Sequence, residues 1–197
     1  FLKGPVTMRI LTPATVDQLL ASIPERSPFG ARDKALIVLD LHTGLRSHEL
    51  VALNVGHVLT RDGSPREWLE VIGKGGYHRQ VPLNAAARQA ILDLVQFNHS
   101  RGFSVAPESP LLVTRCHRRL PTRSLRDIIQ RHRERADLDV RCSPHSLRHT
   151  FASRLAGCAP LPVVQVALGH KRLSSTQVYT HTTPAQLAAG VARLAGG

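Results

Sequence analysis

The sequence predicts a mainly α-helical domain that carries one small, three-stranded antiparallel sheet. Apolar residues recur at helical spacing over most of the chain, for example at Val16, Leu19 and Ile23. The exception is residues 67–83, where two alternating segments flank a glycine-rich connection in the manner of a β-hairpin. A chain of 197 residues is long enough to bury a substantial core.

Capping and breaking residues place the first helices. Thr12 and Pro13 form an N-cap followed by proline at the first helical position, so a helix is expected to begin there. Residues 24–30 contain two prolines and a glycine, which end this helix. A second helix is expected at about residues 31–42, where Gly44 stops it, and a short helix is expected to follow.

The sheet is expected to come from three short segments. Residues 67–72 and 79–83 alternate between apolar and polar side chains, and residues 111–113 are the third candidate strand. A helix from about residue 84 to residue 99 separates the second and third strands. After the third strand the chain is expected to be helical nearly to its end, with breaks near residues 157–162, Gly169 and Pro184.

Charge is the strongest compositional signal. The chain has 26 lysines and arginines against 14 acidic residues, a net charge of +12, and all but four of the basic residues are arginine. A GC-rich genome would account for arginine over lysine but not for the excess of base over acid. Because the guanidinium fork matches phosphate oxygens bidentately, this composition favours a nucleic-acid partner, DNA or RNA.

The segment at residues 115–135 is a candidate DNA-backbone surface. It holds eight arginines against two acidic residues and is expected to be helical. The alternative is that these charges form the solvated face of an ordinary helix. The DNA-binding candidates in this segment are Arg118, Arg119, Arg123 and Arg126.

Several other classes of protein are disfavoured. The three cysteines, Cys116, Cys142 and Cys158, have no C-x-x-C spacing, so neither a disulfide framework nor a zinc site is expected. No apolar run approaches the roughly 20 residues of a membrane span, and the first residues lack the features of a secretory signal. The expected location is the cytoplasm, in association with the nucleoid.

Five short segments carry candidate chemistry. His145 and Arg148 are three residues apart, so they share one face of a helix. Pro144 places them in its first turn, where the positive end of the helix dipole faces the same anion as the arginine. The five segments are residues 43–50 (TGLRSHEL), 73–75 (GKG), 145–149 (HSLRH), 168–170 (LGH) and 176–181 (TQVYTH).

In their order and near their spacings, these segments resemble the tyrosine recombinase (phage-integrase-like) family over residues 12–183. The similarity is strongest from Pro144 to His181, and Xer-type and transposon-borne members are the most similar. The resemblance implies a mainly α catalytic domain with its active site in a basic groove. It also implies site-specific cleavage and rejoining of duplex DNA by a homotetramer assembled on the DNA. The reaction would pass through a 3′-phosphotyrosyl intermediate, without metal, ATP or another cofactor.

The resemblance assigns phosphate-binding roles to several residues. Arg46 and Arg148 match the two arginines that clamp the scissile phosphate, whose charge grows in the pentacoordinate transition state. His170 matches a position that hydrogen-bonds the phosphate. Glu49 matches an acidic residue that braces the site, and His149 matches a position that is more often structural than catalytic.

The resemblance also assigns the nucleophile and the proton transfers. Tyr179 matches the nucleophile, and His145 matches the residue that helps to remove its proton. Lys74 matches the hairpin lysine that protonates the departing 5′ oxygen, a task that needs an ammonium able to release a proton. Tyr77, the other tyrosine, does not match, so its role is DNA contact or none. Taken singly, each residue has a structural alternative such as a surface charge, a helix cap or a packed aromatic.

Three segments are expected along the chain. They are a lead-in at residues 1–11, the catalytic domain at residues 12–183 and a tail helix at residues 184–197. The mostly apolar tail is expected either to dock on a neighbouring protomer when DNA is bound or to pack on its own domain. Members of the family also carry an N-terminal helical domain that closes a clamp around DNA. The chain is expected to be a fragment or to lack that half of the clamp.

Three alternative functions stay open. A type IB-like topoisomerase would use the same chemistry but rejoin strands only to themselves. A catalytically silent DNA-binding module would need none of the six candidate catalytic residues, and the chain has all of them. An arginine-rich RNA-binding protein would explain the charge but none of the motifs.

Overall fold

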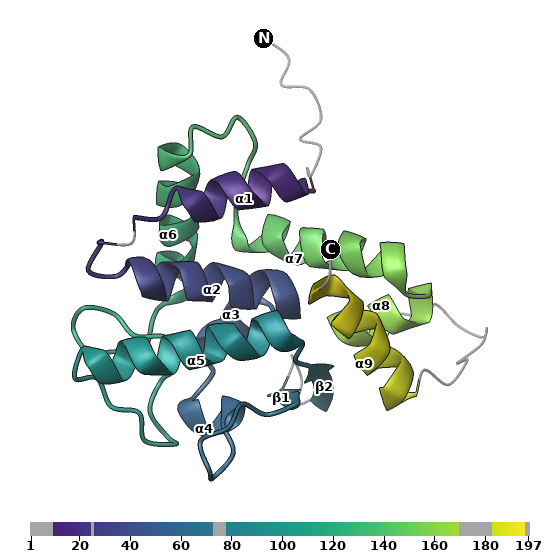
Figure 1. Ribbon diagram of the computed structural model, residues 1–197, viewed down its shortest axis with the longest axis horizontal. Coiled ribbons are helices and arrows are strands. Elements are labelled where there is room, and N and C mark those ends of the chain that lie inside the picture. The colour runs from purple at the N-terminus through teal and green to yellow at the C-terminus, as the bar shows by residue number, and fades with distance from the viewer. Residues whose placement is uncertain (1–9, 25, 73–77, 170–182, 196–197) are drawn as a thin grey trace.

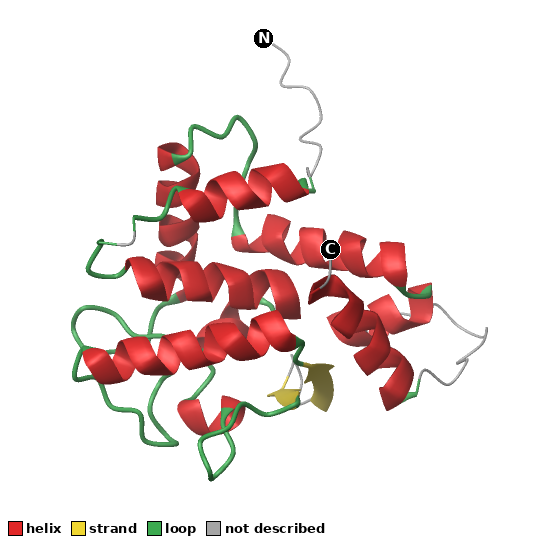
Figure 2. Cartoon of the chain, in the orientation of Figure 1, coloured by secondary structure: helices red, strands yellow, loops and turns green. Residues whose placement is uncertain are grey.

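The computed structural model describes residues 10–24, 26–72, 78–169 and 183–195. Helices dominate this part of the chain, and one small hairpin lies at its edge (Figure 2). In chain order the elements are α1 (Pro13–Ala21), α2 (Gly30–Thr43), α3 (Ser47–Val51), α4 (Val55–Val58), β1 (Trp68–Ile72), β2 (His78–Pro82), α5 (Ala85–Ser100), α6 (Thr122–Arg135), α7 (Pro144–Cys158), α8 (Leu161–Leu168), α9 (Pro184–Ala192) and the short η1 (Arg193–Ala195).

Helix α2 is the centre of the fold. It packs against α5 on one side and α7 on the other (Figure 1). Its apolar side chains, among them Leu36, Leu39 and Leu41, are buried in the main core. A second apolar cluster around Phe151 and Leu155 joins α7 to α8 and α9. Helix α7 therefore connects the central helix α2 to the C-terminal helices α8 and α9.

The helix boundaries agree with the capping signals. The Thr12 hydroxyl accepts a hydrogen bond from the Thr15 N–H at 3.2 Å, and Pro13 begins α1. Gly44 ends α2 in the left-handed conformation, with φ of +57°. A Cβ at Gly44 would also collide with the Phe151 ring, so two independent constraints require glycine there. This sharp end of α2 sets the position of Arg46.

The sheet has two strands within the described residues, where three were predicted. Strands β1 and β2 are antiparallel, with register from Trp68↔Pro82 to Ile72↔His78. The predicted third strand, residues 111–113, pairs elsewhere: the Leu111 N–H donates to the Leu53 carbonyl at 3.0 Å. Because the backbone groups of this segment already hydrogen-bond to loop backbone, they do not pair with the hairpin.

The C-terminal helix packs on its own domain. Leu187, Val191 and Leu194 are buried against α7 and α8. The Asn84 amide donates to the Val191 carbonyl at 3.2 Å, and Arg193 donates to the Cys158 carbonyl at 3.0 Å. The tail of this single chain thus packs on its own domain, and docking on a neighbouring protomer when DNA is bound stays a prediction. None of the described helices is long and apolar enough to cross a bilayer.

Candidate active site

Arg46 and Glu49 form one unit at the start of α3. Arg46 is the N-cap residue of this helix, and Glu49 is its third residue. The Glu49 carboxylate accepts the Arg46 backbone N–H at 2.8 Å and Arg46 Nη1 at 3.1 Å. Glu49 is buried, whereas the Arg46 side chain is 36% exposed. Glu49, which was expected to brace the site, is therefore in contact with Arg46.

Ser143 caps α7 and Pro144 begins it, and Arg148 is the fifth residue of the helix, so it lies in the second turn and not in the first turn as predicted. Its guanidinium donates to two carbonyls that lie at the ends of other helices. Nη1 donates to Gly44, at the end of α2, and Nη2 donates to Leu168, at the end of α8, at 2.7 Å. Arg148 therefore ties together the three helix ends that form the site.

The two predicted clamp arginines converge on the end of α8. Arg46 Nη2 donates to the Gly169 carbonyl at 3.4 Å, and Arg148 donates to the adjacent carbonyl, that of Leu168. Burial, followed by the nearby positive charge of Arg46, lowers the pKa of Arg148 to about 10. Arg148 is therefore charged at neutral pH, and the contacts of the two guanidinium groups with adjacent carbonyls place them where both could act on one anion.

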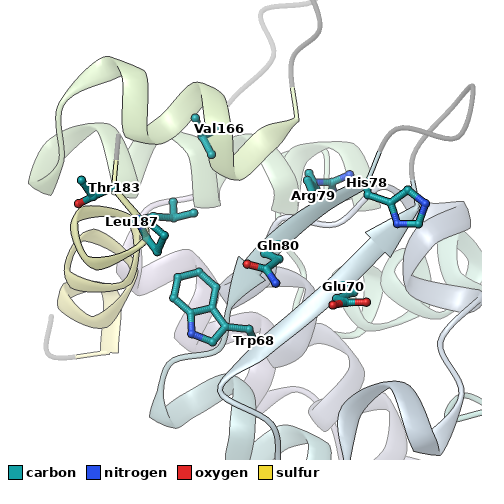
Figure 3. A pocket seen from close by; sticks show the side chains of 9 residues that line it. Trp68, Glu70, His78, Arg79, Gln80, Val166, Thr183 and Leu187 are labelled. Atoms are coloured by element: carbon teal, nitrogen blue, oxygen red, sulfur yellow. The ribbon is translucent and has the colours of Figure 1, made fainter. Parts of the chain in front are cut away.

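A third arginine, Arg79, belongs to the same site and was missed by the sequence analysis. It lies on β2, beside His78, where the hairpin meets α8 and α9 (Figure 3). Its side chain is 3% exposed and donates Nη1 and Nη2 to the two Glu49 oxygens at 2.8 and 2.7 Å. The sequence did contain a signal for Arg79, because the alternation of side chains along a strand puts it on the same buried face as Val81.

The ionisation of Glu49 follows from these contacts. Burial alone would raise the pKa of its carboxyl, but hydrogen bonds from Arg79 and from the Arg46 backbone lower it to about 2. Glu49 is thus a carboxylate at neutral pH. The three arginines and Glu49 together carry two net positive charges, which suits a phosphate whose negative charge grows during reaction.

His145 lies near the N-terminus of α7 and is exposed, beside His149 one turn later. The two Nε2 atoms are 3.1 Å apart, and the rings meet edge to face with centroids at 4.4 Å. A hydrogen bond between two imidazole nitrogens requires one of them to donate and the other to accept. His149 therefore influences which nitrogen of His145 is free to take a proton, consistent with a supporting role.

Three predicted catalytic residues, Lys74, His170 and Tyr179, lie outside the described residues. Their neighbours in the chain are described. Strand β1 ends at Ile72 and β2 begins at His78, so Lys74 belongs to the connection between the strands. Gly169, which ends α8 with φ of +63°, directly precedes His170 in the chain.

The four DNA-binding candidates have different environments in the structure. Arg119 donates to the Val51 and Leu53 carbonyls at 2.9 and 3.1 Å and to the Asn54 amide oxygen at 2.5 Å, which identifies it as a brace for the loop after α3. Arg118 is exposed in the loop before α6, which begins at Thr122 rather than at residue 115. Arg123 and Arg126 are exposed on α6 and line an open groove.

This groove runs from α6 to the candidate catalytic histidine. It has a volume of about 1100 Å³ and is also lined by residues of α3 and of the start of α7, including His145. Its basic side chains are those of Arg123, Arg126 and Arg141, with Asp127 as the acidic side chain in its lining. The groove therefore offers a positively charged surface that leads directly to the active-site candidates.

Asp40 is a second carboxyl near Arg148 and differs sharply from Glu49. It is 1% exposed, and within the described part of the chain neither of its oxygens has a hydrogen-bond partner. Burial raises the pKa of Asp40 well above its ordinary value, and the charge of Arg148 opposes the rise only in part. Folding therefore favours the protonated carboxyl.

We expect Asp40→Asn to change the pH dependence of stability. The folded state retains a proton on Asp40 that the unfolded state loses above about pH 4, so the wild-type free energy of unfolding falls as the pH rises. Relative to the wild type, the free energy of unfolding of the asparagine variant should rise by up to about 1.4 kcal/mol per pH unit above about pH 4, until the pH reaches the raised pKa of the folded carboxyl. Urea denaturation at several pH values measures this difference. Parallel curves for the two proteins would show that Asp40 is ionised in the folded state.

Residues 9–186 match the profile of the phage integrase family. The chain belongs to this family. A tyrosine recombinase XerD of Ralstonia nicotianae is 35% identical over 186 residues, which cover 94% of this chain and 59% of that protein. A tyrosine recombinase XerC of Pelotomaculum thermopropionicum is 36% identical over 91% of this chain and 59% of that protein. The chain spans about three-fifths of the length of these curated relatives.

Solved structures of a site-specific recombinase and of a phage integrase share the fold. The XerH site-specific recombinase, in a post-cleavage complex with its palindromic difH substrate, aligns with a TM-score of 0.70 and 25% identity over 94% of this chain and 52% of that one. The integrase from mycobacterium phage Brujita aligns with a TM-score of 0.65 and 26% identity over 98% of this chain and 58% of that one. The predicted fold, a mainly α recombinase catalytic domain with a small antiparallel sheet, is confirmed, apart from the third strand.

Proposed function

We propose that this domain cleaves and rejoins duplex DNA at specific sites through a 3′-phosphotyrosyl intermediate on Tyr179. The observation that carries the proposal is the convergence of Arg46 and Arg148 on adjacent carbonyls at the end of α8, directly before His170 in the chain. The relatives named tyrosine recombinases and the XerH complex with cleaved DNA support it. The proposal extends their activity to this chain on the ground of 35% sequence identity to one such recombinase and of the fold shared with XerH.

The proposed reaction is an exchange of one phosphate ester for another. The Tyr179 oxygen attacks the scissile phosphorus and loses its proton to His145. The bond from phosphorus to the 5′ oxygen breaks, and Lys74 gives that oxygen its proton. Arg46 and Arg148 stabilise the charge that grows on the non-bridging oxygens, with His170 as a further donor. A 5′-hydroxyl then attacks the phosphotyrosine and reverses these steps, so no bond energy is lost.

The proposed partner is double-stranded DNA, and the proposed working unit is a homotetramer. Exchange between two duplexes breaks four strands, and each chain supplies one Tyr179, so four copies are required. The basic groove would hold the backbone on one side of the cleaved phosphate, through Arg123, Arg126 and Arg141. Arg119 is excluded from this contact set because its donors already serve the loop after α3.

A suicide duplex tests the proposed function. A nick beside the cleavage site lets the small cleaved fragment diffuse away and traps the covalent complex. DNA flanking the gene is incubated, in EDTA and without ATP, with this chain and with the full-length gene product. We expect a covalent protein–DNA band on a denaturing gel. Retarded DNA without a covalent band from either protein would instead identify a binding module. Relaxation of supercoiled plasmid without transfer to a second duplex would identify a topoisomerase.

The groove makes a separate prediction about salt. Replacing Arg123 and Arg126 together by glutamine should weaken DNA binding and lower the slope of log Kd against log salt by about 2, since each lost phosphate contact removes about 0.9. Binding of a labelled duplex at a series of salt concentrations measures the slope. The matched control replaces two exposed arginines outside the groove, Arg61 and Arg135, by glutamine. Equal slopes for the two double variants would refute the proposed DNA path.

A further inference from the structure

The two oxygens of Glu49 are shared between two arginines. Oε1 accepts Arg79 Nη1 at 2.8 Å and Arg46 Nη1 at 3.1 Å. Oε2 accepts Arg79 Nη2 at 2.7 Å and the Arg46 backbone N–H at 2.8 Å. Each oxygen therefore has one partner on β2 and one partner on the residue that caps α3. The position of Arg46 is tied to that of Arg79 through a single buried carboxylate.

We propose that Arg79 is a positioning residue for DNA cleavage, which holds Glu49 so that the Arg46 guanidinium stays directed at the scissile phosphate. The inference rests on the proposed function, because it concerns the rate of the cleavage step. Arg79 touches neither the phosphate nor the nucleophile in this scheme. It acts through Glu49 on Arg46.

The charge balance explains why a second arginine is needed. With Arg79 absent, the buried Glu49 carboxylate would have Arg46 as its nearest cation and would draw the Arg46 fork into a two-bond pair. An arginine held in that way has fewer free N–H donors for a phosphate, and the carboxylate cancels more of its positive charge. Arg79 supplies two charge-assisted hydrogen bonds of its own, so Arg46 keeps an exposed edge for the substrate.

Stability alone does not account for this arrangement. A buried ion pair recovers its desolvation cost only in part, and apolar residues of similar volume often give equal or greater stability. The Arg79 Nε also has no hydrogen-bond partner among the described residues, although it is buried. A side chain selected for packing would carry no such unsatisfied donor. The arrangement is better explained by the direction that it gives to Glu49 and Arg46.

Arg79 also contacts the end of α8. A Cβ added to Gly169 would lie 2.7 Å from Arg79 Cδ, so glycine is required there both by this approach and by its φ of +63°. The Gly169 carbonyl is the acceptor of Arg46 Nη2. Arg79 thus sets the spacing between the hairpin that leads to Lys74 and the helix end that leads to His170.

The test compares Arg79→Met with wild type in single-turnover cleavage of the suicide duplex. Methionine keeps an apolar stem in the buried site and removes both hydrogen bonds to Glu49. We expect the cleavage rate to fall about 10²-fold, because small displacements of a positioned group have effects of this size. The Kd for DNA should change less than threefold, since the exposed phosphate contacts remain. Arg79→Lys should recover part of the rate, because it restores a positive charge without the fork.

A pH profile adds a readout that lost packing would not produce. In wild type, Glu49 stays ionised at every pH used for cleavage. In Arg79→Met the hydrogen bonds that lower the pKa of Glu49 are reduced, so its pKa should rise, and the rate should fall more steeply than the wild-type rate as the pH drops from 8 to 5. The double variant Arg79→Met with Glu49→Gln should cleave no more slowly than Glu49→Gln alone, since both substitutions break the same Arg79–Glu49 pair.

Arg32→Met is the matched control for a lost buried arginine. Arg32 is 6% exposed and bonds the Asp33 carboxylate and the Val113 carbonyl, away from the site. Its replacement should lower stability but leave the rate per folded molecule unchanged. If wild type cleaves and folded Arg79→Met or Arg79→Lys matches its rate and pH profile, the positioning role is wrong while the proposed function stands. If wild type forms no covalent complex, the proposed function itself fails.

Discussion

Tyr179→Phe is expected to reduce covalent attachment of DNA to background while leaving DNA affinity within about twofold of wild type. The substitution removes one hydroxyl oxygen, the atom that would form the bond to phosphorus. It leaves the aromatic ring and every described cation in place. Gel detection of the trapped complex and a separate binding titration measure the two quantities on the same protein.

Tyr77→Phe is the matched control, because Tyr77 and Tyr179 are the two tyrosines of the chain. This substitution removes the hydroxyl oxygen of Tyr77, which lies close to Lys74 in the sequence. The Tyr77 variant should still form the covalent complex. Attachment that survives in Tyr179→Phe and disappears in Tyr77→Phe would mean that the nucleophile has been assigned to the wrong tyrosine.

Arg148→Lys is expected to lower the cleavage rate by about 10²–10³-fold, the usual effect of removing one preorganised donor from a transition state. Lysine keeps the positive charge but loses the fork that reaches Gly44 and Leu168 together. A lysine at position 148 could not bond to both helix ends at the same time, nor to two phosphate oxygens at the same time. Single-turnover rates at saturating protein isolate this effect from binding.

Arg135→Lys provides the comparison for Arg148→Lys. Arg135 is exposed at the end of α6, so the same change of residue type there should leave the rate unchanged. Thermal denaturation of both variants gives the folded fraction by which each rate is corrected. A corrected rate for Arg148→Lys within a few-fold of wild type would remove Arg148 from the proposed catalytic set.

Local signals in the sequence were sufficient for most of the secondary structure. Thr12, Pro13 and Gly44 act through their own backbone and nearest neighbours, and their predicted roles are confirmed. The third strand was predicted wrongly because a short apolar run does not reveal its partner. Leu111 finds a backbone partner at Leu53, far away in the sequence, and this pairing depends on how the loops pack.

The candidate site shows the same difference between contacts that are local in the sequence and contacts that depend on tertiary structure. The family resemblance assigned Arg46 and Glu49 to one site, and the structure places them in contact. Arg79 pairs with Glu49 across 30 residues, and strand register decides this pairing. Arg119 and Arg123 looked equivalent in the sequence, yet one braces a loop and the other is 91% exposed in its side chain. The direction of an arginine side chain is set by tertiary structure, which composition does not encode.

The measurement that tests the central claim most directly is the mapping of the covalent bond. The trapped complex is digested with nuclease and trypsin, and the nucleotide-bearing peptide is identified by mass spectrometry. Trypsin places Tyr179 on the peptide of residues 173–193 and Tyr77 on that of residues 75–79. We expect a nucleotide joined by its 3′-phosphate to Tyr179 in the first peptide. A nucleotide on residues 75–79, on a serine, or joined by a 5′-phosphate would contradict this assignment.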